Sequence, residues 1–343
     1  MNVGLIARCD STGLGIQSVE FFKNIPCKAL VIDFSAMAPG LSDILRPRTE
    51  QYPGQTVFKW GNKHNLRGDI PTPVINDFLD GLDVVFAMET PYDYNIFQIA
   101  RARGIKTVLQ FNYEFLDFPS ALPAPDLFAA PSMWNYNLVP DRKKFLPVPI
   151  CQPPTPINKH ARTFVHIAGR PAANDRNGTQ IFLQSLEFVQ NEIIAVVRSQ
   201  RPVHIPQINN KKVRLVTDFS NKSDRWENYH NATALVLPRK YGGLCLPINE
   251  AIGCGIPVIA PNISPNNTWL PSEWLVPAEY CGSLQSKRKI EMYECRPEHV
   301  ARKIDEFCDT AFHIETTKKV YELNRMWGWE QLKSKYYEAC GNL

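Results

Sequence analysis

The sequence predicts an α/β protein built from two parallel-sheet domains that face each other across a cleft. In the first half of the chain, short apolar runs alternate with helix-like stretches, which is typical of βαβ units. A stretch with five prolines between Leu146 and Pro156 interrupts this alternation and predicts a stiff linker. The alternation restarts after the linker, so the second half predicts a second sheet of the same kind.

The expected strands are apolar runs, most of them with β-branched residues, and the expected helices lie between them. A glycine at position 255 can cap the helix that precedes the strand at 257–260. Strands are predicted at 3–7, 29–32, 84–87, 107–110, 127–130, 163–168, 193–197, 213–216, 234–237 and 257–260. Helices are predicted at 16–24, 74–82, 94–103, 178–188, 224–229, 249–253, 297–308 and 329–340.

The composition indicates a globular protein and argues against several other classes. The chain has 343 residues, of which 44% are hydrophobic and 21% charged, so disorder is excluded as its main state. A net charge of +4 does not by itself indicate nucleic acid binding. No apolar run approaches the about 18–20 residues that cross a bilayer, and the start does not resemble a signal peptide. The nine scattered cysteines argue against a disulfide framework or zinc site and favour a reducing cytoplasm.

The first chemistry-bearing segment, residues 8–17, directly follows the first predicted strand. Gly13 and Gly15 let the backbone approach a ligand, and the next helix offers a positive N-terminus. Ser18 stands where the dinucleotide-binding fingerprint needs a third glycine. The segment is therefore equally compatible with a tight turn between strand and helix. Asp10 lies in the same loop and is a candidate catalytic carboxylate.

The second segment follows the first strand of the second domain. Arg170 and Arg176 lie six residues apart across a turn, and their guanidinium forks suit a diphosphate. A helix that starts near Gly178 is expected to add its N-terminal dipole. A solvated loop with two surface arginines is the alternative.

The third segment, residues 235–260, contains a buried strand, a glycine turn, a helix and another buried strand. Gly242 and Gly243, followed by Leu244, free backbone N–H groups to meet an anion. Glu250 can accept two hydrogen bonds from a diol such as that of ribose. A charge that complements the start of the helix is the alternative role for Glu250.

Segments two and three, in this order and spacing, resemble the donor-binding half of retaining glycosyltransferases of the GT-B fold, in the glycogen-synthase-like family four. The GT-B fold has two Rossmann-like domains. The amino-acid sequences of segments 240–247 and 262–267 look most similar to those of bacteriophage-encoded glycosyltransferases. The matching positions are Gly169-Arg170, Gly178, Pro238, Gly243, Leu246-Pro247, Glu250-Ala251, Gly255 and Pro257-Val258-Ile259.

The resemblance implies a division of the chain and a set of roles. Residues 1–150 would form the acceptor-side domain, residues 151–326 the nucleotide-sugar domain, and residues 327–343 a helix that crosses back to the first domain. The diphosphate would be held by Arg170, Arg176 or Lys240 with the amides near Gly243, and the ribose by Glu250. The loop with Gly13 and Gly15 would approach the donor from the other domain. Arg170, Glu250 and Asp10 are the predicted catalytic residues.

The resemblance also implies retention of anomeric configuration and no bound metal or other cofactor. Three positions depart from the family pattern. Gly242 stands where the family has the first of two glutamates, which helps to orient the donor sugar. Cys245 replaces a glycine, and Asn177 replaces a lysine. The missing glutamate at Gly242 puts the usual sugar contacts, and hence the identity of the donor sugar, in doubt, whereas Arg176 could supply the charge missing at Asn177.

The acceptor is expected to contact the first domain, and the phage-like resemblance suggests a hydroxymethylated base in DNA or a hydroxyl of a virion protein. A small-molecule or glycan acceptor is a further possibility. An inverting reaction would need a base on this domain. Candidates for that base are Asp10, His64, Glu89, Asp93, Glu114 and Asp117. Several aromatic side chains of this domain could stack on an acceptor or fill the core, namely Trp60, Phe111, Tyr113, Phe115, Phe118, Trp134 and Tyr136. The basic patch at 142–144 could contact phosphates or be a solvated face.

Three other functions fit parts of the sequence. A catalytically silent protein that binds a nucleotide-sugar or a glycan would explain the missing glutamate at Gly242. A sugar-nucleotide epimerase of the same fold would convert the donor without an acceptor. A nicotinamide-dependent oxidoreductase is suggested by Gly13 and Gly15, but the missing third glycine disfavours it.

Overall fold

The computed structural model divides into two compact units, Met1–Val148 with Trp329–Leu343 (unit 1) and Pro149–Gly328 (unit 2). The two boundaries lie within two residues of the ends at 150 and 326 that the resemblance suggests. The structure describes residues 1–36, 45–61, 70–116, 123–139, 142–157, 161–169, 173–220, 222 and 224–341.

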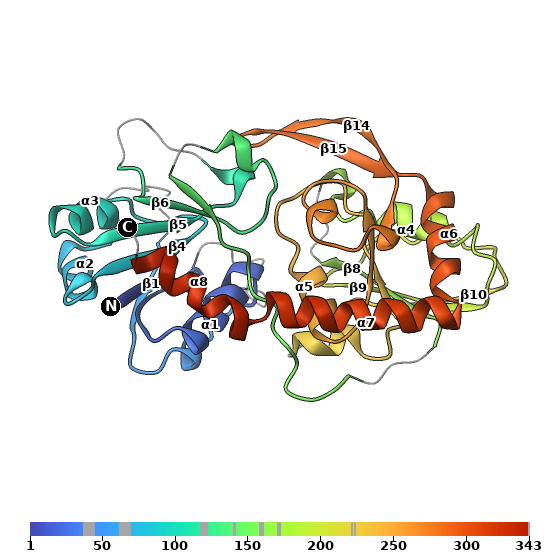
Figure 1. Ribbon diagram of the computed structural model, residues 1–343, viewed down its shortest axis with the longest axis horizontal. Coiled ribbons are helices and arrows are strands. Elements are labelled where there is room, and N and C mark those ends of the chain that lie inside the picture. The colour runs from blue at the N-terminus through green and yellow to red at the C-terminus, as the bar shows by residue number, and fades with distance from the viewer. Residues whose placement is uncertain are drawn as a thin grey trace. The chain divides into compact units, whose positions relative to one another are not determined.

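Unit 1 contains a seven-stranded parallel sheet in the order β3-β2-β1-β4-β5-β6-β7. Figure 1 labels β1, β4, β5 and β6 of this sheet. The strand order reverses between β1 and β4, which makes their carboxyl ends the switch point of this sheet. The strands are β1 (Val3–Arg8), β2 (Cys27–Asp33), β3 (Thr56–Lys59), β4 (Val84–Met88), β5 (Lys106–Gln110), β6 (Leu127–Ala130) and β7 (Lys143–Phe145). The helices are α1 (Gly13–Asn24), α2 (Thr72–Leu79), α3 (Asn95–Ala102) and α8 (Trp329–Gly341).

The two strands at the centre of unit 1, β1 and β4, are apolar along nearly their whole length because helices cover both faces of a parallel sheet. All five residues of β4 are buried, and β1 is buried from Val3 to Ala7. The helix α8 completes this core from the far end of the chain. Its Tyr336 ring lies 5.8 Å from the Phe21 ring of α1 and 6.0 Å from the Phe86 ring of β4.

Unit 2 contains a six-stranded parallel sheet in the order β10-β9-β8-β11-β12-β13, and its switch point lies between β8 and β11. The strands are β8 (Thr163–Gly169), β9 (Ile193–Ser199), β10 (Val213–Asp218), β11 (Ala234–Val236), β12 (Val258–Pro261) and β13 (Leu275–Val276). An antiparallel hairpin, β14 (Ala278–Gln285) with β15 (Lys289–Cys295), follows them. The helices are α4 (Thr179–Ser185), α5 (Leu246–Gly253), α6 (Pro297–Phe307) and α7 (Thr310–Trp327).

The sequence missed several elements of this fold. The strands β3 and β7, the hairpin β14–β15 and the helix α7 were not expected. The expected basic patch at 142–144 overlaps β7, where Lys144 pairs with Glu338 of α8. The nine cysteines all lie among the described residues and are free thiols. In the part of the chain that the structure describes, no helix has the length and apolar character needed to cross a membrane.

Candidate functional site

The second and third segments meet at the switch point of the unit 2 sheet. Gly178 adopts a φ of 71°, and a Cβ there would lie 2.0 Å from the backbone oxygen of Pro238. Only a glycine therefore lets the turn after β8 run against the turn after β11. The backbone N–H of Lys240 also donates a hydrogen bond to the Arg176 oxygen at 2.9 Å. Two stretches about 60 residues apart in sequence thus form one loop cluster.

Two guanidinium groups lie beside Gly242 in this cluster. A Cβ at this glycine would lie 2.3 Å from Nη2 of Arg239 and 2.8 Å from Nη2 of Arg176. The Arg176 guanidinium lies over the Tyr241 ring, 4.8 Å from its centre. Nε of Arg239 donates to the Tyr241 backbone oxygen at 2.8 Å. The sequence identified Arg176, but it gave no reason to select Arg239.

Lys240, the third cation of the cluster, has an acidic neighbour. Its Nζ lies 3.4 Å from Oε1 of Glu294 on β15. The N–H of Tyr293, also on β15, donates to the Lys240 oxygen at 3.0 Å. The base of the hairpin therefore holds this loop and partly offsets the charge of Lys240.

The glycine turn leads directly into α5. Gly243 is buried and Leu244 is half-buried, three and two residues respectively before the first helical residue, Leu246. Cys245 has a φ of −132°, so the glycine that the family pattern has at this position is not required here. Glu250 is the fifth residue of α5 and lies outside the first turn. A role as a charge at the helix start is therefore excluded.

The Glu250 carboxylate is held from both sides by residues of the 3₁₀ helix Arg225–Tyr229. The Tyr229 hydroxyl donates to Oε2 at 2.6 Å, and Nε of Arg225 lies 3.7 Å from Oε1. Burial, reinforced by the Glu250 charge, raises the pKa of Tyr229, so its hydroxyl remains a donor. A carboxylate can accept about four hydrogen bonds, and the Tyr229 hydroxyl fixes the orientation of Oε2. The Glu250 side chain is 12% exposed.

The start of α4 differs from the expectation. Its first amides do not face an external anion, because the Asp175 carboxylate accepts hydrogen bonds from the N–H groups of Thr179 and Gln180 at 2.8 and 2.9 Å. The predicted contribution of this helix dipole to diphosphate binding is therefore wrong. An aspartate only three residues before the predicted start of the helix was a usable signal for this cap.

His166 connects the elements beneath the loop cluster, and the sequence did not select it. Nδ1 donates to the Val236 oxygen of β11 at 2.9 Å, because a carbonyl can only accept. Nε2 must then accept from the Thr179 hydroxyl of α4, also at 2.9 Å. Complete burial lowers the pKa of His166 to about 4, so the ring is neutral near pH 7. His166 is a positioning residue that fixes β8, β11 and α4 together.

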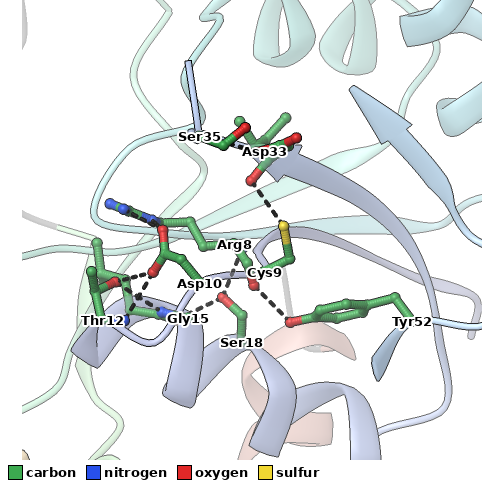
Figure 2. Close-up of polar contacts among 11 residues, drawn as sticks. Arg8, Cys9, Asp10, Thr12, Gly15, Ser18, Asp33, Ser35 and Tyr52 are labelled. Atoms are coloured by element: carbon green, nitrogen blue, oxygen red, sulfur yellow. Dashed lines mark hydrogen bonds and ion pairs between the residues drawn. The ribbon is translucent and has the colours of Figure 1, made fainter. Parts of the chain in front are cut away.

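The first segment, at the switch point of unit 1, is satisfied internally (Figure 2). Nε of Arg8 donates to Oδ2 of Asp10 at 2.8 Å, and the Thr12 N–H donates to Oδ1 at 3.0 Å. Thr12 in turn caps α1 by accepting from the Gly15 N–H at 3.4 Å. Asp10 is 4% exposed. Both oxygens of this candidate catalytic carboxylate are therefore engaged within its own turn.

The two glycines of that segment differ in their surroundings. A Cβ at Gly15 would lie 1.9 Å from the Asp10 backbone oxygen, so local packing alone requires a glycine there. Gly13 is exposed at the first position of α1. The structure thus explains Gly15 without a ligand, as the alternative of a tight turn predicted.

The other candidates differ in burial, and some of them lie outside the described residues. Asp93 is fully buried and accepts from the N–H groups of Asn95 and Ile70. Glu114 is also buried, whereas Glu89 is half-buried with a φ of 65°. Most of the candidate aromatic side chains belong to the core, and Phe115 is the exposed exception at 48%. His64, Asp117, Phe118 and Arg170 lie outside the described residues.

The two parallel sheets and their switch points define a GT-B fold, the architecture of two Rossmann-like domains. The chain matches no protein-family model and no curated protein sequence. Among solved structures, HepE from Anabaena in complex with UDP-glucose is 10% identical, with a TM-score of 0.65 over 100% of both chains. The lipopolysaccharide outer core galactosyltransferase WaaB is 12% identical, with a TM-score of 0.60 over 99% of both chains. A glycosyltransferase from Rickettsia africae is 12% identical, with a TM-score of 0.61 over 99% of this chain and 98% of that one.

Proposed function

We propose that this protein is a glycosyltransferase that moves a sugar from a nucleoside-diphosphate sugar to an acceptor hydroxyl. Unit 2 carries the donor in this proposal. The observation that supports it most is the meeting of the second and third segments at the unit 2 switch point, where Gly178 packs on Pro238 and Arg176 reaches Gly242. Ligands of open parallel sheets bind at this kind of position. The GT-B neighbours, one of them holding UDP-glucose, agree with it.

The charges of the loop cluster suit this reaction. Negative charge builds on the leaving diphosphate as the glycosidic bond breaks, and cations that are already in place stabilise that state more than the ground state. Arg176 and Lys240 would supply this charge, together with Arg170 and the amides near Gly243. Glu250, oriented by Tyr229, would accept hydrogen bonds from the ribose hydroxyls.

The finer parts of the proposal rest on the family resemblance. The reaction would proceed with retention and without a bound metal, because protein cations neutralise the diphosphate. The acceptor would be a hydroxymethylated base in phage DNA or a hydroxyl of a virion protein. DNA as the acceptor would require the base to be flipped out of the stack, with binding that weakens steeply as salt increases.

The test is a panel of labelled UDP-glucose, UDP-galactose and GDP-mannose, incubated with and without DNA that contains hydroxymethylated bases or with virion proteins. We expect release of a nucleoside diphosphate that increases with the correct acceptor. NMR of the product would report its anomeric configuration. Glu250→Gln should weaken nucleotide binding by about 1.5–3 kcal/mol, the range for hydrogen bonds to a charged group.

Glu298→Gln is the matched control, because Glu298 is exposed in the first turn of α6. It should leave nucleotide binding and turnover unchanged. Donor binding without turnover, with every acceptor tested, would instead support the catalytically silent protein. Stabilisation by NAD and by none of the nucleoside diphosphates would overturn the proposal.

A further inference from the structure

We propose that Arg176, Arg239 and Gly242 form a site for an oxyanion group of the donor, either a phosphate of its diphosphate or a carboxylate on its sugar. This inference rests on the proposed function and adds Arg239 to the residues that contact the donor. It also gives Gly242 a role, since this glycine makes room for the two guanidinium groups.

The absence of a side chain at position 242 creates the site. Nη2 of Arg239 and Nη2 of Arg176 come within 2.3 and 2.8 Å of the point that a Cβ would occupy. Gly242 also has a φ of 131°, which side chains of L-residues rarely allow. Space and backbone conformation thus both select glycine, and the result is a pair of guanidinium groups converging on one backbone position.

Both arginines are oriented before any ligand arrives. Nε of Arg239 donates a hydrogen bond to the Tyr241 backbone oxygen at 2.8 Å, which fixes the plane of its guanidinium group. The two terminal nitrogens are the donors that would bind an anion. The Arg176 guanidinium is stacked on the Tyr241 ring at 4.8 Å. The Arg239 guanidinium is held through one nitrogen and the Arg176 guanidinium packs on a ring through one face, so little side-chain entropy is lost when an anion binds.

The charge around the pair favours an anion. Two like charges held close together repel each other, and an oxyanion between them relieves this repulsion. In the described part of the chain, Arg239 makes no ion pair, whereas Lys240 beside it faces Glu294. Arg239 is therefore the better placed of these two consecutive cations to bind a ligand.

The shape of the pair favours an oxyanion over a halide or a neutral hydroxyl. A guanidinium group presents parallel N–H donors that match two oxygens of a phosphate or carboxylate. Two sources in a nucleotide-sugar meet this requirement, namely the diphosphate itself and the carboxylate of a uronic acid. The two sources predict different ligand dependences for the same substitution.

The experiment measures dissociation constants by calorimetry for inorganic pyrophosphate, uridine, UDP, UDP-glucose and UDP-glucuronic acid. The proteins are the full chain, Arg239→Gln, Arg239→Lys and the control Arg214→Gln. Arg214 is exposed on β10 and makes no described ion pair. Circular dichroism verifies that each variant is folded. Arg239→Lys retains the charge but loses the fork, so it should fall between the parent and Arg239→Gln.

We expect Arg239→Gln to weaken binding of at least one of these anions about tenfold or more, with uridine binding unchanged. Weaker binding of pyrophosphate, UDP and UDP-glucose would assign the pair to the diphosphate. Weaker binding of UDP-glucuronic acid alone would assign it to a sugar carboxylate. Affinities equal to those of the parent for all anions would overturn the inference.

The pyrophosphate arm separates this inference from the proposed function. If the parent protein binds pyrophosphate through Arg239 but no nucleotide, the oxyanion site stands and the nucleotide-sugar proposal fails. If the parent binds UDP and Arg239→Gln binds every ligand equally well, the proposed function stands and the arginine pair does not contact the donor. If the parent binds none of the anions, both are overturned.

Discussion

The turn after β1 in unit 1 and the turn after β8 in unit 2 have the same backbone requirement. Each lies at the switch point of its sheet and leads into a helix, α1 or α4. Each connection has a glycine, Gly15 in the first turn of α1 and Gly178 just before α4, where a Cβ would collide with a carbonyl oxygen, 1.9 Å from that of Asp10 and 2.0 Å from that of Pro238. The need for a glycine therefore does not distinguish a ligand site from a tight turn.

The charges do distinguish the two turns. In unit 1 the Arg8 guanidinium is bonded to the Asp10 carboxylate of the same turn. In unit 2 the Arg176 guanidinium is directed to Gly242, where it meets the guanidinium of Arg239. The lesson is that a strand, a glycine turn and a helix indicate a ligand site more strongly when cationic groups from two separate turns converge at one glycine, as Arg176 and Arg239 do at Gly242.

The largest effects should come from the two glycines. We expect both Gly15→Ala and Gly178→Ala to lower the free energy of unfolding by about 3 kcal/mol, because a methyl group has no space beside a backbone oxygen. Chemical denaturation measures this loss. Titration with UDP of the fraction that remains folded should separate the variants, with weaker binding for Gly178→Ala and parental affinity for Gly15→Ala. Equal loss of UDP affinity in both would contradict the difference between the turns.

The carboxylates Asp10 and Glu250 should give the next largest effects. Substitution of Asp10 should lower stability, and substitution of Glu250 should weaken UDP binding. Asp10→Asn should lower the free energy of unfolding by about 2 kcal/mol, because it removes the charged partner of the part-buried Arg8, and it should leave UDP affinity unchanged. Glu250→Gln should show the reverse, with a small change in stability and weaker UDP binding. A fall in kcat for Asp10→Asn at unchanged UDP affinity would support its predicted catalytic role.

Measured per pH unit, the smallest effect is a pH dependence in unit 2. An unfolded histidine titrates near pH 6.5, whereas burial lowers the pKa of His166 to about 4 in the folded protein. Between these pH values the unfolded chain binds a proton that the folded chain does not. Stability should therefore fall as pH decreases from about 6.5 to about 4, by up to about 1.4 kcal/mol per pH unit.

Denaturation at several pH values would measure this slope. His166→Gln should remove its contribution, and His204→Gln should retain it, since His204 is exposed. If both variants kept the same slope as the parent, the burial of His166 would not govern the acid stability of unit 2.

The parts of the fold that the sequence predicted are those with a strong apolar pattern. All five strands predicted in the first half are present, because each carries a buried run such as that of β4. The missed strand β3 has four residues that alternate between half-buried and exposed. The strand β14 is mostly exposed, β15 has only two buried residues, and α7 buries few side chains along its eighteen residues. Their patterns were therefore too weak to detect.

The site was predictable where it depends on backbone and not where it depends on side chains that meet in space. The glycine at position 178 and the glutamate at 250 were selected from the pattern of strand, turn and helix and from the resemblance to family four. The convergence of Arg176 and Arg239 could not, because it depends on the turn after β8 crossing the turn after β11. The Asp175 cap of α4 was missed for the opposite reason, since its sequence signal was present but was not used.

The central claim is that the unit 2 switch point binds a nucleoside diphosphate, and amide hydrogen exchange with and without UDP tests it most directly. Bound UDP should slow exchange in the peptides that cover 173–180 and 238–250, whereas the exposed strand β10 should not change. Unaltered exchange in both of these peptides at a UDP concentration that saturates the protein would contradict the claim.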